Sequence, residues 1–435
     1  MTAEADAMPT PKLAYVYHPQ SFAPLSIVEA ADGVCRFIWI IDSSDPDAAA
    51  MQRPLRRFGP VVDAAGLTVD EVVALVSVHE PDGVLSMHDA DLVWTARLAA
   101  ELHRPFHSLD TAIRLTDKHA QRTALAAAGL SVPAFAVIPS DADDAAVAIL
   151  AEGFPYPAVL KPRRGQASRD TVPIGSAAEL RAAMAGYRAR PGLPLEEHIL
   201  EQFVSDPTEP LGGEGFAPFV SVESVVEDGR VAHAAISART PFRWPFRETG
   251  YCTPTAIAPT LQTDILRVAG DAARALGVTH ACLHTEIKLT DDGPVVIEVN
   301  GRPSGGMSEM LERASGYSIL RTALRLALGM PVGLGGPVPC SRVGYLLYVF
   351  PESDSTWIDA VDGLSELRAI EGVEEIVLVR GPGHHIDWRE GSEAHVFHLA
   401  GTTRDHDELR GLIAAIATLV RIDEHDEPVP AIEEG

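Results

Sequence analysis

The sequence predicts a chain of mixed α/β and α+β type that is divided into several units. Three short apolar runs, at residues 12–17, 36–41 and 83–86, lie near the N-terminus and are separated by stretches with helical spacing. Two alternating runs within residues 279–307 indicate a β-hairpin. Strand-like and helix-like segments alternate again between residues 344 and 421. A chain of 435 residues has room for two to four such units.

The N-terminal segment predicts a doubly wound α/β domain over residues 1–115. Its apolar runs are typical of buried parallel strands, and residues 91–103 have helical spacing up to Arg104-Pro105. No G-x-G-x-x-G follows these strands, so the pattern lacks the dinucleotide-binding fingerprint. The next helix is predicted to begin at Thr116 as its cap, with His119 in the place of the capping-box glutamate.

A lysine at the end of an apolar strand is the first candidate for binding chemistry. Lys161 ends the run at residues 154–162 and precedes a basic loop at residues 163–170. Because an unpaired ammonium is costly to bury, such a lysine needs an anionic partner, and a phosphate is one. The alternative is a strand-end lysine that extends to water.

A loop rich in arginine and aromatic residues follows the strand predicted at residues 230–239. Residues 239–251 contain three arginines, Glu248 and two prolines. Arginines can bind a carboxylate and Glu248 an ammonium, so the loop suits a zwitterion. The alternative is an exposed loop with chance aromatics. An amphipathic helix at residues 261–276 then leads into the hairpin.

The hairpin is expected to place two carboxylates opposite each other. A three-residue turn with Gly293 in the left-handed conformation would pair Leu289 with Val295 and Glu286 with Glu298. Like charges directly opposite in a sheet are destabilising, so a bound cation would favour this pair.

The chemistry of the hairpin and of the turn after it indicates a metal and an anion. Glu286, Glu298 and Asn300, two residues further on, offer the hard oxygen ligands that suit Mg²⁺. The turn at residues 301–306 adds Arg302 and flexible glycine backbone, which can approach an anion. The alternative is a solvated outer face of the sheet.

The C-terminal part predicts a small α+β unit. After an apolar helix at residues 315–328, strands are expected at 344–350, 375–380 and 394–400, with helices at 359–371 and 405–419. The predicted domains are residues 1–115, 116–204, 205–335 and 336–435.

Composition narrows the function classes. The net charge of −26 makes a nucleic-acid partner a poor expectation, because phosphate-backbone binding needs a basic surface. Four widely spaced cysteines, no secretory signal pattern and no apolar run near 20 residues predict a cytoplasmic protein without a membrane span.

The stretches HTEIK at 284–288 and VIEVNGRPSGG at 296–306 resemble the metal-binding hairpin of ATP-grasp enzymes. Within that family the chain is most similar to carboxylate–amine ligases that join amino acids into dipeptides. The resemblance implies an ATP-grasp fold between the N-terminal α/β domain and a C-terminal α+β subdomain. It also implies two Mg²⁺ ions, with Mn²⁺ as an alternative, on Glu286, Glu298 and Asn300. Arg302, Gly305 and Gly306 would act on the acyl phosphate.

The same resemblance implies the remaining binding residues. The ATP-binding set, with the adenine hinge at residues 196–204, is Lys118, Lys161, Ser168, Glu201, Gln202, Phe203 and Val204. The substrate-binding set is Arg239, Thr240, Glu248, Gly250, His284, Arg302, Ser304 and Met307. The ribose-binding acid stays open among Glu209, Glu214 and Glu223.

The function that the resemblance implies is ATP-dependent amide-bond formation between an amino-acid carboxylate and an amine, with amino acids and ATP as small-molecule partners. A homodimer is one of the assemblies compatible with it. The alternatives are an ATP-grasp ligase for bicarbonate or a nucleotide precursor, and a nucleotide-binding regulator without turnover.

Overall fold

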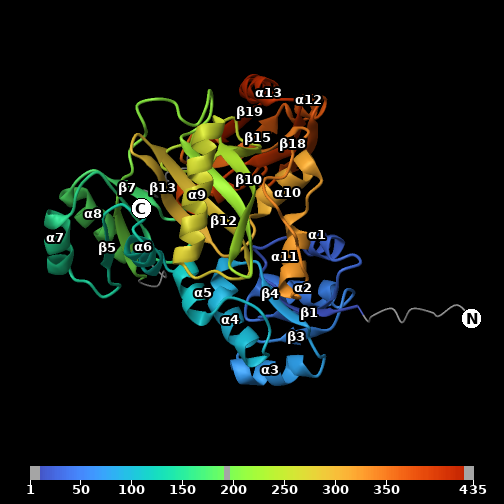
Figure 1. The fold of residues 1–435 in the computed structure, drawn as a ribbon. Coiled ribbons are helices and arrows are strands. Elements are labelled where there is room, and N and C mark those ends of the chain that lie inside the picture. The colour runs from blue at the N-terminus through green and yellow to red at the C-terminus, as the bar shows by residue number, and fades with distance from the viewer. Residues whose placement is uncertain (1–9, 191–195, 426–435) are drawn as a thin grey trace, which may run out of the picture.

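Four β-sheets with helices packed on them form the computed structural model, which describes residues 10–190 and 196–425 (Figure 1). The N-terminal sheet is parallel, in the order β3-β2-β1-β4. Its strands are β1 (Lys12–Val16), β2 (Arg36–Ile41), β3 (Val61–Asp63) and β4 (Gly83–Ser86). The sequence predicted three of these strands, and β3 was missed because three residues carry too little pattern.

Helices cover both faces of the N-terminal sheet, as the doubly wound prediction requires. α3 (Val69–Ser77) and α4 (Leu92–Glu101) pack on one face, through Val72, Val76 and Leu98. On the other face lie α1 (Pro24–Ala30), α2 (Pro46–Leu55) and, from much later in the chain, α11 (Ile319–Ala327). The fold class predicted from the sequence is confirmed.

A smaller antiparallel sheet follows, in the order β5-β8-β6-β7. It consists of β5 (Phe135–Ile138), β6 (Ala158–Pro162), β7 (Val172–Ile174) and β8 (His198–Gln202), packed against α7 (Asp144–Gly153) and α8 (Ala177–Arg188). Two helices, α5 (Leu109–Thr116) and α6 (Lys118–Ala127), connect it to the N-terminal sheet. The predicted cap was wrong by one residue: Thr116 ends α5, and the Asp117 carboxylate caps α6 by accepting from the N–H groups of His119 and Ala120.

The largest sheet has eight strands, in the order β13-β12-β9-β10-β11-β14-β18-β16. Its bounds are β9 (Phe219–Glu227), β10 (Arg230–Arg239), β11 (Gly250–Thr253), β12 (Ala281–Thr290), β13 (Gly293–Asn300), β14 (Val343–Val349), β16 (Val373–Leu378) and β18 (Phe397–Thr403). The C-terminal strands therefore extend the sheet that carries the hairpin.

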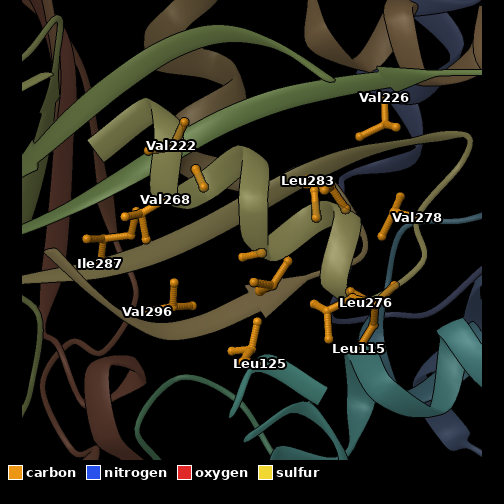
Figure 2. Close-up of a cluster of buried hydrophobic side chains, with 14 of the residues drawn as sticks. Leu115, Leu125, Val222, Val226, Val268, Leu276, Val278, Leu283, Ile287 and Val296 are labelled. Atoms are coloured by element: carbon orange, nitrogen blue, oxygen red, sulfur yellow. The ribbon is translucent and has the colours of Figure 1, made fainter. Parts of the chain in front are cut away.

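The core of this sheet fixes which way the hairpin side chains point. Figure 2 shows α9 (Pro259–Ala275) lying across β9, β12 and β13, with Val268 close to Val222, Ile287 and Val296. Leu115 and Leu125 of α5 and α6 close the same cluster. Because side chains alternate along a strand, burying Leu283, Ile287 and Leu289 on this face sends Glu286 to the other.

The hairpin register was predicted in part. Glu286 does pair with Glu298, but Leu289 pairs with Pro294, since the turn is the two-residue Asp291-Asp292. A bulge at Ile297 restores the register of the glutamates, and it puts Val296 and Val299 on one face. The Ile297 carbonyl accepts from Arg122, a long-range bond that local spacing cannot reveal.

Two further elements near the site differ from the sequence prediction. Residues 305 and 306 begin the helix α10 (Gly305–Ser315) instead of belonging to a flexible turn. The helix expected at 359–371 is wrong in its first part: β15 (Ser355–Asp362) occupies it, and only α12 (Leu364–Arg368) follows. β15 pairs with β17 (His385–Asp387) and β19 (Arg421–His425), and it buries Thr356 and Ile358 on one face.

The remaining elements are the 3₁₀ segments η1 (Asp89–Asp91) and η2 (Trp388–Glu393) and the helix α13 (His406–Leu419). No helix among the described residues is long and apolar enough to cross a membrane.

Candidate active site

A cavity of about 650 Å³ brings the hairpin, the small sheet and loops of the N-terminal sheet together. Most of the predicted site residues line it: Lys118, Lys161, Ser168, Glu201, Gln202, Phe203, Val204, Arg239, Glu248, His284, Glu286, Glu298, Asn300, Arg302, Ser304, Gly305 and Gly306. Thr240, Gly250 and Met307 do not. The predicted residues that line the cavity therefore come from positions 118 to 306 of the chain.

The paired carboxylates sit among cations at one wall of the cavity. Lys118 Nζ lies 2.9 Å from Glu298 Oε1, and Arg239 Nη2 lies 3.4 Å from Glu286 Oε1. Burial alone would raise the pKa of Glu286, but the hydrogen bond from His284 and the nearby Arg239 lower it to about 2. Asn300 uses its amide nitrogen to donate to the His284 carbonyl, which leaves its amide oxygen as a ligand. This set of ionised and amide oxygens fits Mg²⁺.

His284 is buried behind the carboxylates and connects Glu286 with Glu223. Its Nδ1 lies 2.5 Å from Glu223 Oε1, and its Nε2 lies 3.4 Å from Glu286 Oε1. Burial lowers the pKa of His284, but the two glutamates outweigh this and raise it to about 9. Both ring nitrogens therefore contact protein carboxylates. The geometry lets His284 hold Glu286, and its contact with substrate stays a prediction.

Lys161 and Glu201 form a second buried network beneath the small-sheet side of the cavity. Lys161 Nζ lies 2.7 Å from Glu201 Oε2, and Arg122 Nε lies 2.9 Å from Glu201 Oε1. Burial, more than any charge, lowers the pKa of Lys161. The Glu201 carboxylate is engaged by these two cations. Glu201 therefore anchors Lys161, and its contact with the adenine amino group stays a prediction.

The hinge after β8 has fewer open backbone groups than the sequence suggested. The N–H groups of Gln202 and Phe203 donate to the carbonyls of Ala134 and Pro157. Within the described residues, the Val204 N–H has no backbone partner.

The basic loop 163–170 is anchored at both ends. Arg163 and Arg164 pair with the capping carboxylate of Asp117, at 2.7 and 3.0 Å. Lys118 Nζ donates to the Gly165 carbonyl at 2.7 Å, which ties the loop to the hairpin carboxylate Glu298 through one side chain. Ser168, with a left-handed φ of 56°, lines the cavity.

The loop between β10 and β11 supplies an ion pair at the opposite wall. Arg239 is buried, and its Nε lies 2.6 Å from Glu248 Oε1. The hydroxyl of Tyr251 donates to Glu248 Oε2 at 2.8 Å, and the Tyr251 ring lies beneath the guanidinium, 4.4 Å away. Arg243 and Arg247 turn away and pair with Asp354. Of the three arginines predicted to surround Glu248, only Arg239 does so.

Arg302 is held by an acid from the N-terminal domain. Its Nε and Nη2 lie 2.8 and 2.5 Å from Asp89 Oδ2. Next to it, Ser304 precedes α10, so that Gly305 and Gly306 form the first turn of that helix. A Cβ on Gly306 would lie 2.6 Å from Leu346 Cδ2, whereas one on Gly305 would meet nothing within 4 Å. The helix start offers N–H groups to an anion beside Arg302.

Three predicted substrate-binding residues support the site from behind. The Thr240 hydroxyl bonds Thr249 at 2.6 Å, and Gly250 begins β11 close to the Leu346 carbonyl. Met307 is buried against Met310 and Tyr251. None of the three lines the cavity, because the β10–β11 loop and α10 turn these residues toward the sheet, and their assignment as substrate contacts stays a prediction.

The structure also places residues that sequence reasoning missed or left open. Three residues that were missed hold predicted residues in place: Asp89 contacts Arg302, Arg122 contacts Glu201, and Tyr251 contacts Glu248. No local sequence pattern distinguishes these three residues. Glu223 is buried against His284, while Glu209 and Glu214 lie outside the cavity lining, so none of the three open candidates fits a ribose contact. Asp206, paired with Lys288, does line the cavity after the hinge.

Comparisons with known proteins agree with this architecture. Residues 154–310 match the model of the ATP-grasp domain. The L-amino acid ligase of Bacillus licheniformis has a similar structure, with a TM-score of 0.73 and 20% identity over 96% of this chain and 99% of that one. A carboxyaminoimidazole ribonucleotide synthase of Aspergillus clavatus follows at a TM-score of 0.70 and 14% identity, over 94% and 99%. This chain has the ATP-grasp fold and contains an ATP-grasp domain, which confirms the resemblance.

Among curated relatives, an uncharacterized protein, y4rH, of Sinorhizobium fredii is 26% identical over 69% of this chain and 59% of its own length. Carnosine synthase 1 of Gallus gallus is 29% identical over 37% of this chain and 17% of its own length. The chain thus spans less than two thirds of the relatives that it matches.

Proposed function

We infer that this chain is an ATP-dependent carboxylate–amine ligase that joins an amino-acid carboxylate to an amine, with a second amino acid as the amine. One observation carries the proposal, the distribution of charge in the cavity. A carboxylate pair suited to Mg²⁺ lies between two walls. One wall has an excess of lysine and arginine, and the other has arginine–carboxylate pairs. The first wall suits phosphates, and the second suits a zwitterion.

The nucleotide would lie between the small sheet and the hairpin. Lys161 and Lys118 would contact its phosphates, Ser168 and the loop 163–170 would cover them, and the Val204 N–H would meet the adenine edge. Asp206 is our candidate for the ribose hydroxyls, in place of the glutamates considered from the sequence. Glu286, Glu298 and Asn300 would hold Mg²⁺, which supplies positive charge against the phosphates when bound.

The carboxyl-donating amino acid would lie between α10 and the β10–β11 loop. Its carboxylate would face Arg302 and the N–H groups of Gly305 and Gly306. A carboxylate has about four acceptor positions, so Glu248 can take an ammonium beside its contacts with Arg239 and Tyr251. These contacts would fix one carboxylate oxygen toward the nucleotide.

The reaction then proceeds in two displacements. The substrate carboxylate oxygen attacks the terminal phosphorus of ATP, and the bond to ADP breaks. The amine nitrogen next attacks the acyl carbon, the bond to phosphate breaks, and the amine proton is lost to solvent. Arg302 and the α10 N–H groups would stabilise the negative charge that develops on the acyl oxygen. No protein nucleophile is needed.

The similarity to carboxyaminoimidazole ribonucleotide synthase makes a ligase for bicarbonate or a nucleotide precursor the second candidate. The paired Arg239, Glu248 and Tyr251 favour an amino acid over bicarbonate, which has no ammonium for Glu248. A regulator without turnover would have no use for two facing carboxylates beside Lys118.

A screen of amino-acid pairs tests the proposal. We expect phosphate release from ATP to require both members of a pair, with a matching dipeptide mass in the products. Release that responds to bicarbonate but to no amino-acid pair would move the chain to the second class. ATP binding without release under any pair or bicarbonate would favour the regulator.

A further inference from the structure

The 3₁₀ segment η2 of the C-terminal part contacts both walls of the cavity, and the proposed reaction does not use it. Two of its residues, Ser392 and Glu393, line the cavity. One side of η2 meets the basic loop 163–170, and the other meets the β10–β11 loop that carries Glu248. The segment therefore joins two parts of the site that are distant in the sequence.

The backbone of η2 holds the second half of the loop 163–170. The Ser392 N–H donates to the Ala167 carbonyl at 3.0 Å, and the Asp170 N–H donates to the Arg389 carbonyl at 3.1 Å. Ala167 and Asp170 have left-handed φ values of 56° and 50°, a conformation that costs free energy for residues other than glycine. Surrounding contacts must therefore hold the loop in this shape, and η2 supplies two of them.

Gly391 makes the close approach of η2 to the loop possible. Its φ of 68° and ψ of −136° lie in a region that glycine adopts readily and other residues do not. A Cβ at this position would lie 2.1 Å from the Ala167 carbonyl oxygen and 2.8 Å from the Ser168 carbonyl carbon. Both are backbone atoms, so any side chain at position 391 would push the loop away from η2.

The Ser392 side chain contacts the opposite wall. Its Oγ accepts a hydrogen bond from the Glu248 N–H at 3.0 Å, and Ser392 is only 7% exposed. The Glu248 carboxylate extends from this backbone to Arg239 and Tyr251. Ser392 thus bonds the loop of one wall through its N–H and fixes the proposed ammonium partner of the other wall through its hydroxyl.

The segment η2 is itself fixed to the C-terminal part of the large sheet. His395, just before β18, donates from Nδ1 to the Ser392 carbonyl at 3.1 Å. Arg380, just after β16, donates to the Glu393 carbonyl and pairs with Glu390. Because η2 is held at several points, the positions of the two loops that contact it depend on each other.

We propose that η2 couples nucleotide binding to amino-acid binding, with Ser392 as the positioning residue, an inference that rests on the proposed function. The first ligand would order the loop 163–170, η2 and Glu248 together, so that the second ligand meets a site already ordered. Such coupling is reciprocal, because each ligand must strengthen the binding of the other by the same factor.

Calorimetry of the full chain measures the coupling. The probe is an ATP analogue with nitrogen between its last two phosphorus atoms, titrated with Mg²⁺ in the absence and presence of the acyl-donor amino acid from the pair screen. We expect the parent to bind the analogue about tenfold more tightly when the amino acid is present. Gly391→Ala and Ser392→Ala should both lose this gain.

The two variants should differ in which ligand they affect first. Gly391→Ala should weaken binding of the analogue alone, because the loop would no longer be held over the phosphates. Ser392→Ala keeps its N–H, so binding of the analogue alone should stay near normal. The KM for the acyl donor should rise about fivefold in Ser392→Ala, the value of one hydrogen bond. Coupling retained in Ser392→Ala would overturn the role of Ser392.

Matched controls come from the same part of the chain. Gly383 also has a left-handed φ, of 83°, but a Cβ there would meet nothing within 4 Å. Gly383→Ala therefore carries a similar backbone strain without displacing the loop. Ser365→Ala removes an exposed serine hydroxyl that bonds only Glu366 in the described structure. Both controls should show the coupling of the parent.

Trypsin cleavage tests the contact between η2 and the loop without any substrate, since the loop contains the half-exposed or exposed Arg164 and Arg169. We expect faster cleavage in Gly391→Ala than in Gly383→Ala, with thermal unfolding confirming that both are folded. Equal cleavage would overturn the proposal. Failure of the proposed function has a different signature: no amino acid is active in the pair screen, yet Gly391→Ala is still cleaved faster than Gly383→Ala.

Discussion

The two walls of the cavity differ in how their charges are balanced. On the nucleotide side, Lys118, Lys161 and Arg122 share Glu201 and Glu298. If Glu298 serves a metal ion, three cations face one carboxylate. On the substrate side, Arg239 pairs with Glu248 and Arg302 with Asp89. A surplus of positive charge suits phosphates, whereas balanced pairs suit a molecule that carries both charges.

The contrast teaches that burial by itself does not identify a ligand. Arg239 is buried and Lys161 is largely so, with 12% of its side chain exposed, and both already have a protein partner. They differ in the net charge of the wall on which they lie. After the ion pairs are counted, the wall with Lys161 keeps a positive charge, whereas the wall with Arg239 is balanced. The variants below alter that balance on one wall at a time.

The largest effect is expected at the boundary between the walls. Glu298→Gln removes one of the facing carboxylates while the hydrogen-bonding shape stays similar. We expect turnover to fall by about 1,000-fold or more, because charge stabilisation of the phosphates depends on this pair. Phosphate release at saturating Mg²⁺ measures it. Glu209→Gln, an exposed residue outside the cavity, is the matched control, and near-normal release by Glu298→Gln would refute the metal assignment.

The next effect is on stability and its pH dependence. Burial raises the pKa of Glu201, but Arg122 and Lys161 outweigh this and lower it to about 2. A depressed folded-state pKa contributes stability above the unfolded value of about 4.5, and this is lost as the pH falls toward 2. Glu201→Gln leaves both cations unpaired, so we expect a loss of about 3–5 kcal/mol at pH 7.

Urea unfolding of parent and Glu201→Gln at several pH values checks this. The difference in unfolding free energy should stay constant down to about pH 4.5 and shrink below it. A difference that is independent of pH through this window would mean that Glu201 does not carry its charge in the way the geometry indicates.

On the nucleotide wall itself, Lys161→Ala should weaken ATP binding by about ten- to a hundred-fold, or roughly 1.5–3 kcal/mol, by removing a charge-assisted contact. Calorimetry with the full chain measures the affinity. Lys12→Ala, a lysine of the N-terminal sheet that is partly exposed, should leave it unchanged. Equal ATP affinity in Lys161→Ala and the parent would remove Lys161 from the nucleotide site.

The smallest effect is expected on the substrate wall. Glu248→Gln keeps the hydrogen bond with Tyr251 but removes the charge, so the KM for one amino acid should rise about tenfold while ATP affinity stays near normal. Steady-state release with each substrate varied in turn provides the comparison. Glu352→Ala, beside the same loop but outside the cavity, is the control. An equal loss toward ATP and both amino acids would indicate a folding defect instead.

The sequence predicted the features that depend on local pattern. The parallel strands and the hairpin followed from alternation, because a buried face requires it. The predicted pairing of Glu286 with Glu298 is correct because the bulge at Ile297 offsets the shorter turn. The bulge at Ile297 escaped detection, because no local spacing marks it and the Ile297 carbonyl bonds Arg122, far away in the sequence. The sequence could not show that Thr240 and Met307 lie outside the cavity lining, because nearness to a site along the chain does not say which way a side chain turns.

The sequence could not predict which charged residues of the site pair with one another. Asp89 holds Arg302 across 213 residues, and Glu223 holds His284 across 61. Such pairs form only when the sheets are assembled, and no spacing rule connects their members. The sequence likewise could not show that the three glutamates considered for ribose lie outside the cavity lining.

The central claim is that the substrate carboxylate is activated by a phosphoryl group from ATP between these two walls. The most direct measurement uses the active amino-acid pair with ¹⁸O in the carboxylate of the acyl donor. The account predicts that one labelled oxygen appears in the released phosphate and that the other stays in the new amide. Phosphate free of label, with turnover intact, would contradict it.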